Sequence, residues 1–541
     1  MSIFKDNKLK IGLFLILFTT ILLSFYSIWN YHGSSASMPN NMPQQGFQEG
    51  RNIFSNDTNQ VPPNREFPSK NSPGEKAPPR ENMPSPNGNM FRHTANSGTK
   101  YATSLAVYSV LFFGLFAVAY YLFANKNIKI RQSNKKALLW TLLGVGLFLR
   151  IAAAPWIGGH PDINLFKNWA TSAAKGLTGF YINGSSDYPP FYIYILFIVG
   201  KIASVPAMNS YFTLLLKLPS ILADIATAYL VYRLAVKYLP LEFSLLISAF
   251  YAFNPAIFIN STFWGQVDSF FTLIVVLAVF MLSENKVFLS GVFFAAAVLM
   301  KPQGIIFLPV LFFELVRLKS VKCFLTAAAA GLGTALAVIL PFSFHQGPFW
   351  IFKLFSSTIG EYPYASVNGF NFYSLLGANY KQDTSTLFVF SYHTWGMIFI
   401  IIVTAFSWFI YIKGRSAKFA SIAALLQITG VFTFSTSMHE RYLFPAAALS
   451  LFAFIYLRDK RLLWLAAGFS ATIFINIYAV FYGMFNGPAG VPYNFTLIIT
   501  SLLNVVFSIY LVKVVWDITV RSKTSTFTQS GSGAKKPPLE M

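Results

Sequence analysis

The sequence predicts an all-α polytopic membrane protein, and three observations support this. Of its 541 residues, 55% are hydrophobic and 11% are charged, an apolar excess outside the usual range of soluble proteins. The apolar residues form about fifteen segments of roughly 15 to 24 residues, near the length of a membrane-crossing helix. Basic residues near both chain ends favour a cytoplasmic location for both, which requires an even number of crossings. We therefore predict about 14 transmembrane helices and one segment that does not span.

Membrane topology accounts for the positive charge. The net charge of +22 comes from 41 Lys and Arg against 19 Asp and Glu. In a soluble protein this surplus would suggest a nucleic-acid partner. Here the basic residues flank apolar segments, as the positive-inside rule predicts for cytoplasmic loops, so we expect membrane lipids and no nucleic acid as partners. Cys323, the only cysteine, excludes an intrachain disulfide or a Cys-based metal cluster.

The N-terminal region carries two predicted helices and a polar loop. Residues 11–29 fit either a signal peptide or an uncleaved anchor, and the lack of a convincing cleavage site favours the anchor. Residues 31–100 are rich in Asn, Pro, Ser and Gly, which predicts a disordered extracytoplasmic loop. The predicted parts are an N-terminal transmembrane anchor (1–30), this loop (31–100), a second helix with a basic cytoplasmic loop (101–136), a main module (137–450), C-terminal transmembrane helices (451–520) and a cytoplasmic tail (521–541).

A single non-spanning segment reconciles the topology with the charges. Strict alternation of helices conflicts with the basic loops that follow residue 283, whereas one re-entrant or broken helix between 190 and 258 removes the conflict. The stretches "FIVGK" (197–201) and "KLPSILAD" (217–224) are the expected places for it. The stretches that then face outside are 158–189, 260–268, 342–391, 437–442 and 483–494.

Acidic residues on this external face carry information because an ionisable group at membrane depth costs roughly 2.5 to 3.5 kcal/mol on insertion scales. Asp162 precedes apolar residues with the spacing of a helix lying along the membrane surface, and it is either an N-cap or a reactive group. Asp187 and Tyr188 precede two prolines at the start of the next apolar segment. The prolines are ordinary at a helix start, so Asp187 is the more informative residue.

Two further stretches place polar groups beside breaks in apolar helices. In "NPAIFINSTFWGQVDSFF" (254–271), Trp264 fits an interfacial anchor, whereas Gln266 and Asp268 are harder to explain in that way. In "LMKPQG" (299–304), the Lys301 amine either snorkels to the interface or pairs with an anion such as a phosphate.

A charged triplet, His439, Glu440 and Arg441, lies in a predicted external loop, where a basic residue is not needed for orientation. Arg150 is a further candidate cation. These acids, cations and aromatic residues together indicate one external site that could deprotonate a hydroxyl and bind an anionic leaving group.

Four stretches resemble the polytopic glycosyltransferases of the GT-C class. They are "DINLFKNWA" (162–170), "DYPPFYIY" (187–194), the 254–271 stretch and "HERYLFP" (439–445), with weaker support from "KPQG" and "YASVNGFNFYSLL" (364–376). The resemblance covers about 137–450. The chain is similar to the dolichyl- or polyprenyl-phosphate-sugar-dependent glucosyl- and mannosyltransferases, including bacterial relatives described as GPI-mannosyltransferase-like.

This resemblance implies a GT-C type fold with amphipathic helices in the first external loop and a catalytic module over 137–450. It implies transfer of a hexose, mannose or glucose, from a polyprenyl-phosphate sugar to an extracytoplasmic lipid, glycan or protein acceptor by inverting displacement. The implied roles are a general base, Asp162; donor-phosphate contacts, Lys301 and Arg441, with Arg150 as a further candidate; and sugar or acceptor contacts, Asp187, Tyr188, Trp264, Gln266, Asp268, His439 and Glu440.

One departure from the family concerns metal binding. Some members carry a second acid two residues after the first, whereas here that position is Asn164. The resemblance then implies catalysis without a metal, and no cofactor beyond the lipid-phosphate sugar that serves as donor.

Other functions predict different features. A lipid-linked glycan flippase or transporter predicts inverted halves and a polar path through the membrane, and no convincing internal repeat is present. A cell-surface polysaccharide polymerase predicts a large external loop with several basic residues, whereas 342–391 contains only Lys353 and Lys381. A non-enzymatic scaffold leaves the acids of the external face without a purpose.

Overall fold

The computed structural model describes residues 2–31, 101–126, 128–157, 161–183, 186–483, 490–523 and 525, all within one compact unit formed by residues 1–33 and 94–541. Within these ranges the fold is helical, apart from a two-residue antiparallel hairpin of β1 (Thr386–Leu387) and β2 (Phe390–Ser391). The predicted disordered loop lies outside the described residues, as does most of the predicted tail.

Ten helical stretches among the described residues are long and apolar enough to cross a membrane, so the chain is a multi-pass membrane protein. The elements that carry these spans are α1 (Ser2–Trp29), α3 (Ala102–Asn125), α4 (Lys135–Ala153) with its flanking turns η2 (Gln132–Asn134) and η3 (Ala154–Trp156), α9 (Phe212–Tyr238), α10 (Leu241–Ala252) continued by α11 (Pro255–Phe258) and η4 (Ile259–Trp264), α15 (Val321–Ser343), α18 (Tyr392–Gly414), η6 (Ala417–Phe419) with α19 (Ala420–Phe434), α21 (Lys460–Gly483) and α22 (Phe495–Thr519).

Shorter helices complete the bundle. Those that are apolar are α7 (Pro190–Ala203), α12 (Asp268–Ser283), α13 (Val287–Met300) and α20 (Ala446–Leu457). The others are α5 (Pro161–Lys175), α6 (Phe180–Asn183), α8 (Pro206–Asn209), η5 (Pro302–Phe307), α14 (Leu308–Leu318), α16 (Trp350–Ile359) and α17 (Phe372–Leu375).

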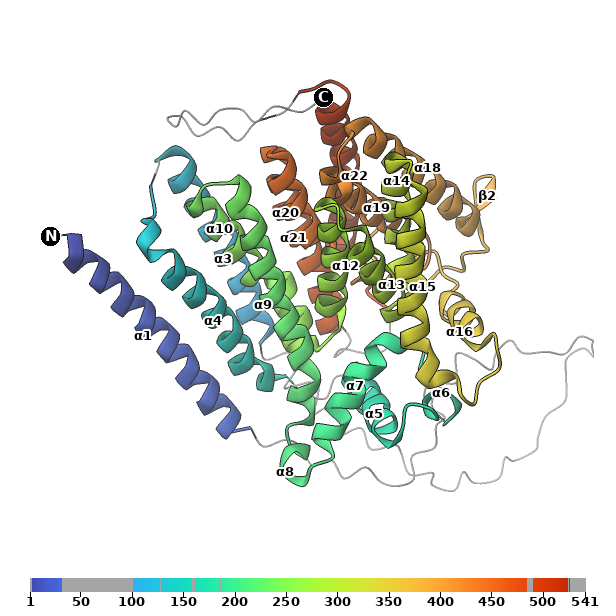
Figure 1. The fold of residues 1–541 in the computed structure, drawn as a ribbon, viewed down its shortest axis with the longest axis horizontal. Helices are drawn as coiled ribbons and strands as arrows, with labels where there is room; N and C mark the ends of the chain where they lie inside the picture. Colours follow the sequence, from blue (N-terminus) through green and yellow to red (C-terminus); the bar gives the residue numbers. More distant parts are fainter. Residues whose placement is uncertain are drawn as a thin grey trace, which may run out of the picture. The chain divides into compact units, whose positions relative to one another are not determined.

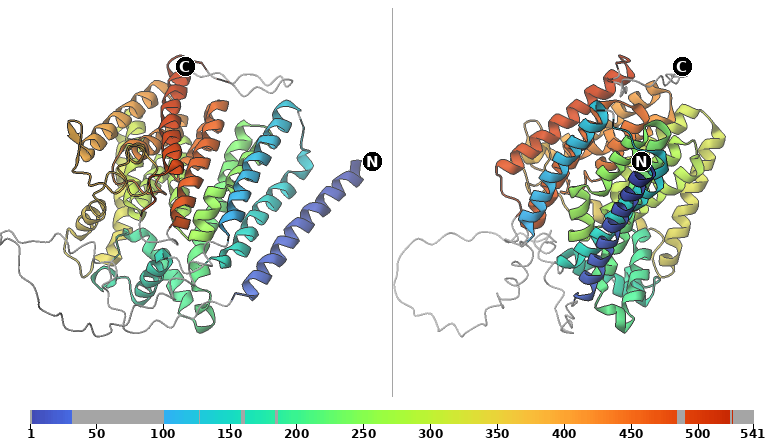
Figure 2. Two further views of the ribbon diagram at one scale, coloured as in Figure 1. Left: turned by 180° about the vertical axis from the view of Figure 1, so that it is seen from behind. Right: turned by 90° about the vertical axis from the view of Figure 1, so that its left-hand side faces the viewer.

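Helices at the centre and at the edge of the bundle differ in burial, as their composition requires. Residues 446–456 of α20 are all buried, which suits a helix that is hydrophobic on every side. In contrast, α15 exposes Leu332, Leu336 and Leu340 along one face, as expected of a helix in contact with lipid. The α1 helix lies along α4 at the edge of the bundle (Figures 1 and 2), where Ser24 Oγ donates to the carbonyl oxygen of Phe148 at 2.7 Å.

The α5 and α7 helices lie together at one end of the bundle (Figure 1). The α5 helix is amphipathic: Ile163, Phe166 and Trp169 are buried on one face, whereas Asn164 is exposed. Gly200 of α7 lies so close to the backbone of α5 that a Cβ atom at this position would overlap the Ala170 carbonyl oxygen.

The non-spanning segment predicted between 190 and 258 stays a prediction. The α7 helix, which begins this range, has 14 residues, as many as α13, so its length does not set it apart from the other short apolar helices. The alternative break at 217–224 is wrong, because α9 runs without interruption from Phe212 to Tyr238. Pro219 is the eighth residue of that helix, and the helix continues through it.

Candidate functional site

Three segments that are distant in sequence meet at Asp162, which lies inside the first turn of α5 and not at its N-cap. The indole Nε1 of Trp264 donates to Asp162 Oδ2 at 2.8 Å, and Gln266 Nε2 donates to the same oxygen. The guanidinium of Arg441 lies over the Trp264 ring, 5.1 Å from the ring centroid. Asp162 therefore accepts hydrogen bonds from two side chains of the segment that contains Trp264 and Gln266. Arg441, from a third segment, stacks on the Trp264 ring of that same segment.

The backbone of the 254–268 stretch explains how Trp264 and Gln266 face the same way. Residues 259–264 form a single π-helical turn, a feature that is frequent at functional sites. Gly265 ends the turn with a φ of +77°, a left-handed conformation that glycine adopts without steric strain. The backbone N–H of Gln266 then donates to the Asn260 carbonyl oxygen at 3.0 Å, and α12 begins at Asp268, three residues after Gly265.

Asp268 is a buried carboxylate between two cations. Its Oδ1 accepts a hydrogen bond from Lys301 Nζ at 2.6 Å, and the side chains of Lys301 and Asp268 are only 7% and 3% exposed. Its Oδ2 accepts from Asn260 Nδ2 at 3.1 Å and lies 3.6 Å from Arg441 Nη1. Lys301 reaches this position because α13 ends one residue earlier and Pro302 follows, so its backbone is extended.

The Asp187 stretch lies beside Lys301. The Lys301 amine is 5.6 Å from the centre of the Tyr188 ring. Asp187 is close enough to Lys301 and to Tyr188 to affect their electrostatics, and its backbone carbonyl accepts a hydrogen bond from Thr358 of α16 at 2.9 Å. These contacts join the start of α7 to the Lys301 side of the site.

The His439 triplet contributes one neutral and two charged groups. Arg441 Nε donates to Glu440 Oε1 at 2.8 Å. The His439 ring lies 4.6 Å from that of Tyr362 and 4.9 Å from that of Tyr442, centroid to centroid. Burial, together with the positive charges of Arg441 and Lys301, lowers the pKa of His439 to about 3. His439 is therefore a neutral imidazole at pH 7, which can both donate and accept a hydrogen bond.

Buried amides of the last two helices hold the loop that contacts His439. Asn476 of α21 donates to the carbonyl oxygen of Asn368 at 2.8 Å and accepts from the backbone N–H of Phe370 at 2.9 Å. Asn504 of α22 donates to the carbonyl oxygen of Phe370 at 2.8 Å. The loop in turn forms backbone bridges with His439. The C-terminal helices thus support the site although they contribute none of its predicted residues.

Of the predicted site residues, Arg150 is the one that the structure places elsewhere. It is fully buried in α4, where its Nε donates to Asp224 Oδ2 at 3.0 Å and its Nη1 donates to the Gly146 carbonyl oxygen at 3.1 Å. The hydrogen bonds of this guanidinium go to Asp224 and to its own helix, whereas Lys301 and Arg441 both pair with Asp268, so Arg150 as a donor-phosphate contact stays a prediction. The other predicted residues lie in one group at the end of the bundle that contains α5 and α7.

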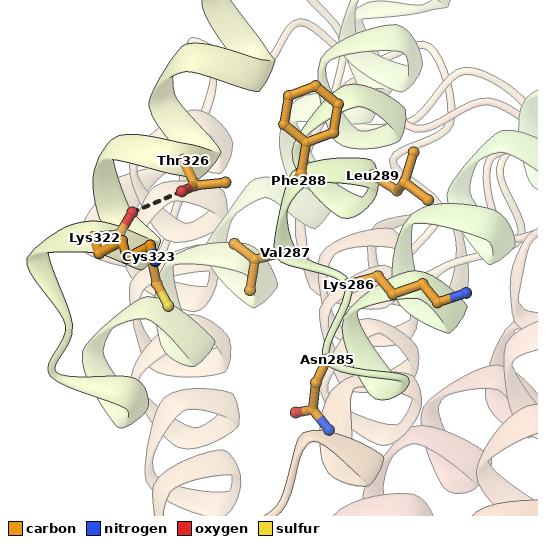
Figure 3. Close-up of a pocket in the computed structure, with 8 residues that line it drawn as sticks. All are labelled: Asn285, Lys286, Val287, Phe288, Leu289, Lys322, Cys323 and Thr326. Carbon is orange, nitrogen blue, oxygen red and sulfur yellow. Dashed lines mark hydrogen bonds between the residues drawn. The ribbon is translucent and has the colours of Figure 1, made fainter.

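A pocket of about 400 Å³ lies at the opposite end of α13, between the start of that helix and the start of α15 (Figure 3). Its two amines do not converge, because Lys286 extends away from α15, which carries Lys322. Thr326 Oγ1 donates to the Lys322 carbonyl oxygen at 2.8 Å, within the same helix. The pocket shares no residue with the site. In the described part of the chain, no three His, Cys, Asp or Glu side chains converge as a metal-binding group.

Several residues of the site carry little or no signal in the sequence. Asn260 was visible as a polar residue within the quoted 254–271 stretch, but only its contact with Asp268 distinguishes it from a capping residue. Tyr362 and Tyr442 carry no signal in a chain with 27 tyrosines. Asn476 and Asn504 could have been found as isolated amides within apolar helices, which are costly unless they are hydrogen-bonded.

These observations define a class of protein: a multi-pass membrane protein in which charged and aromatic side chains form one site at an end of the helix bundle. Residues 187–436 match the family model of Glycosyltransferase family 87. The chain therefore carries a domain of this GT-C membrane glycosyltransferase family and is a membrane glycosyltransferase. No curated protein matches the chain. The matched range contains Asp187, Trp264, Asp268 and Lys301, whereas Asp162 and the His439 triplet lie outside it.

Proposed function

We propose that this glycosyltransferase transfers a hexose, mannose or glucose, from a polyprenyl-phosphate sugar to an extracytoplasmic lipid, glycan or protein acceptor, with inversion at the anomeric carbon. Asp162 is the general base, and Lys301 and Arg441 bind the donor phosphate. The observation that carries the proposal is the convergence on one site of a doubly hydrogen-bonded carboxylate and two cations.

The position of Asp162 suits a base. Two donors, Trp264 Nε1 and Gln266 Nε2, meet at its Oδ2 and fix the orientation of the carboxylate. Such orientation by neighbouring groups is what general-base catalysis requires, because proton transfer depends on the distance between the base and the hydroxyl. Asp162 is also less buried than Asp268 and Glu440, which leaves it the more accessible acid to an incoming acceptor.

The reaction moves one proton and one sugar. The acceptor oxygen forms a bond to the anomeric carbon while its proton passes to Asp162. The bond between the anomeric carbon and the phosphate oxygen breaks, and its electron pair stays on that oxygen. The donor phosphodiester thereby becomes a phosphomonoester and gains negative charge, which Lys301 and Arg441 stabilise as it develops.

Donor binding then involves an exchange of ion-pair partners. Lys301 is paired with Asp268, and Arg441 is paired with Glu440 at 2.8 Å. A phosphate that enters the site replaces one carboxylate at each cation, which the long, flexible Lys stem and the five-donor guanidinium both permit. Tyr188, Trp264, Gln266, Asp268, His439, Glu440 and Asp187 then remain as the sugar or acceptor contacts.

The charges at the opposite end of the bundle support an extracytoplasmic location of the site. The basic residues found there, next to the ends of α9, α13, α15 and α18, include Lys237, Lys286, Lys322 and Lys413. By the positive-inside rule that end faces the cytoplasm. We further propose a GT-C type fold with about 14 crossings, for which some of the shorter apolar helices complete the ten long spans.

A transfer assay tests the proposal. Purified protein in lipid is given polyprenyl-phosphate mannose, glucose, galactose or arabinose with a membrane-extract acceptor, in the presence and absence of EDTA. The variants are Asp162→Asn and a matched control, Asp383→Asn. Asp383 lies in the 342–391 stretch, and its Oδ2 is 3.3 Å from His393 Nδ1 at the start of α18. Loss of a general base lowers the rate by roughly 10²- to 10⁴-fold.

We expect transfer from one donor that survives EDTA, falls by that factor in Asp162→Asn and is kept in Asp383→Asn. Equal activity of Asp162→Asn and wild type refutes the base assignment. Failure to consume any donor refutes the donor class and favours a flippase or a polymerase.

A further inference from the structure

Three polar residues of α9 form a stripe inside the bundle that the proposed reaction does not use. Lys217, Ser220 and Asp224 are spaced so that they share one face of the helix. All are buried, with exposures of 0%, 1% and 0%. We call these three residues the α9 polar ladder. Two ionisable groups within a membrane-spanning helix are costly, so their partners indicate what the ladder does.

The first residue of the ladder holds the segment that leads to Asp162. Lys217 Nζ donates to the carbonyl oxygens of Ala154 at 2.8 Å and Ile157 at 2.7 Å. These carbonyls lie at the C-terminal end of α4 and its 3₁₀ extension, where backbone acceptors lack partners within the helix and a cation is favourable. Lys217 thereby fixes the chain a few residues before α5 begins.

The other two residues hold the segment that contacts Asp162 from the opposite side. Ser220 Oγ donates to the backbone carbonyl of Gln266 at 2.7 Å. Asp224 Oδ2 accepts from Ser261 Oγ at 2.6 Å, inside the π-helical turn, and from Arg150 Nε at 3.0 Å. The segment that presents Trp264 and Gln266 is thus bound to α9 at two points, within the π-helical turn at Ser261 and just beyond it at Gln266.

The two held segments touch each other beside the ladder. A Cβ atom placed on Gly265 would lie 2.5 Å from Ile163 Cδ1, on α5, and 3.1 Å from Lys217 Cγ. The α5 start, the Gly265 turn and α9 are therefore packed with no space between them. A change at the ladder that moves either segment changes the distance between Asp162 and its donors.

We propose that the α9 polar ladder positions Asp162 relative to Trp264 and Gln266, with Arg150 completing it by fixing Asp224. The ladder residues are positioning residues that act through backbone carbonyls and through Ser261. Apolar side chains could pack these helices together without the cost of buried charge, so packing alone does not explain the polar residues. The segments that they hydrogen-bond give them a purpose. This inference rests on the proposed function only in that Asp162 is taken as the base.

The first test does not need activity. In a Cys323→Ser background, which lacks cysteine, Gln266→Cys places a thiol on the turn and keeps the backbone carbonyl that Ser220 binds. Alkylation by a maleimide is timed with Ser220→Ala and with the matched control Ser248→Ala. Ser248 Oγ donates to the Ala228 carbonyl oxygen at 2.9 Å, an equally buried bond between α10 and α9 away from the turn.

We expect Ser220→Ala to speed alkylation by about tenfold, since a lost buried hydrogen bond of about 1 to 1.5 kcal/mol opens the turn by about that factor. Ser248→Ala leaves the rate unchanged. Equal rates in the two variants overturn the proposal.

The second test measures sugar transfer by the same serine variants, without the introduced cysteine. Small misplacement of reacting groups lowers the rate by up to about 10²-fold, so Ser220→Ala is expected to lower kcat by about tenfold or more, with KM for the donor unchanged. Ser248→Ala retains wild-type kcat. An effect confined to KM, or equal in both variants, overturns the positioning role. If wild type transfers no sugar, the proposed function fails, and alkylation alone decides whether the ladder holds the turn.

Discussion

The ion pair between Lys301 and Asp268 gives a quantitative test of the charge arrangement. Removing one partner of a buried pair costs about 3 to 5 kcal/mol, because the other charge remains buried and uncompensated. In Lys301→Met, Asp268 keeps Asn260 at 3.1 Å and Arg441 at 3.6 Å, so we expect the lower end, about 3 kcal/mol. The double variant Lys301→Met with Asp268→Asn removes the buried charge and recovers at least about half of that loss.

The assay is reversible unfolding in mixed detergent and SDS, followed by circular dichroism, on wild type, both single variants and the double variant. The four free energies of unfolding give the coupling between the two side chains. A coupling near zero, or a double variant less stable than Lys301→Met, contradicts the ion pair. Sugar transfer separates stability from function, because the double variant is expected to fold yet to bind the donor weakly, having lost one of the two proposed phosphate contacts.

Three other substitutions report on the groups around the site. Because the pKa of His439 is about 3 in the folded protein against 6.5 normally, the folded state binds fewer protons, and its stability falls as the pH drops below about 6.5. His439→Gln should abolish up to about 2 kcal/mol of the loss between pH 7 and 5; an unchanged pH dependence contradicts a buried neutral imidazole. Asn476→Leu leaves the Phe370 N–H without its acceptor, which costs about 1 to 3 kcal/mol of local stability. Proteolysis within 342–391 should therefore be faster than in wild type. Resistance equal to that of wild type would show that the loop is held elsewhere. Trp264→Phe removes one donor to Asp162 but keeps a ring beneath Arg441, so transfer should fall about tenfold or more. A wild-type rate would mean that the indole N–H does not orient Asp162, the proposed base.

Much of the architecture was predictable because hydropathy is a local property. Each apolar run indicates a helix by itself, so the helical class and the membrane location follow from composition and length. The α7 segment shows the limit of this reasoning. Its composition is as apolar as that of a span, and only the structure shows that it packs through Gly200 against the amphipathic α5 at one end of the bundle. Pro219 shows the opposite error, because α9 continues through this proline, where the sequence predicts a break.

Sequence alone determined the kind of protein, the stretches that carry polar groups and most members of the site, since each stands out against an apolar background in which an isolated charge is costly. Only the tertiary structure decided how those groups pair. Asp162 and Trp264 are separated by 102 residues and Arg150 and Asp224 by 74. Nothing local to Arg150 distinguishes it from Arg441, for both are cations near the end of an apolar run. The packing of α4 against α9 gives Arg150 a buried carboxylate, whereas the loop that contains Arg441 brings it over Trp264 and beside Asp268.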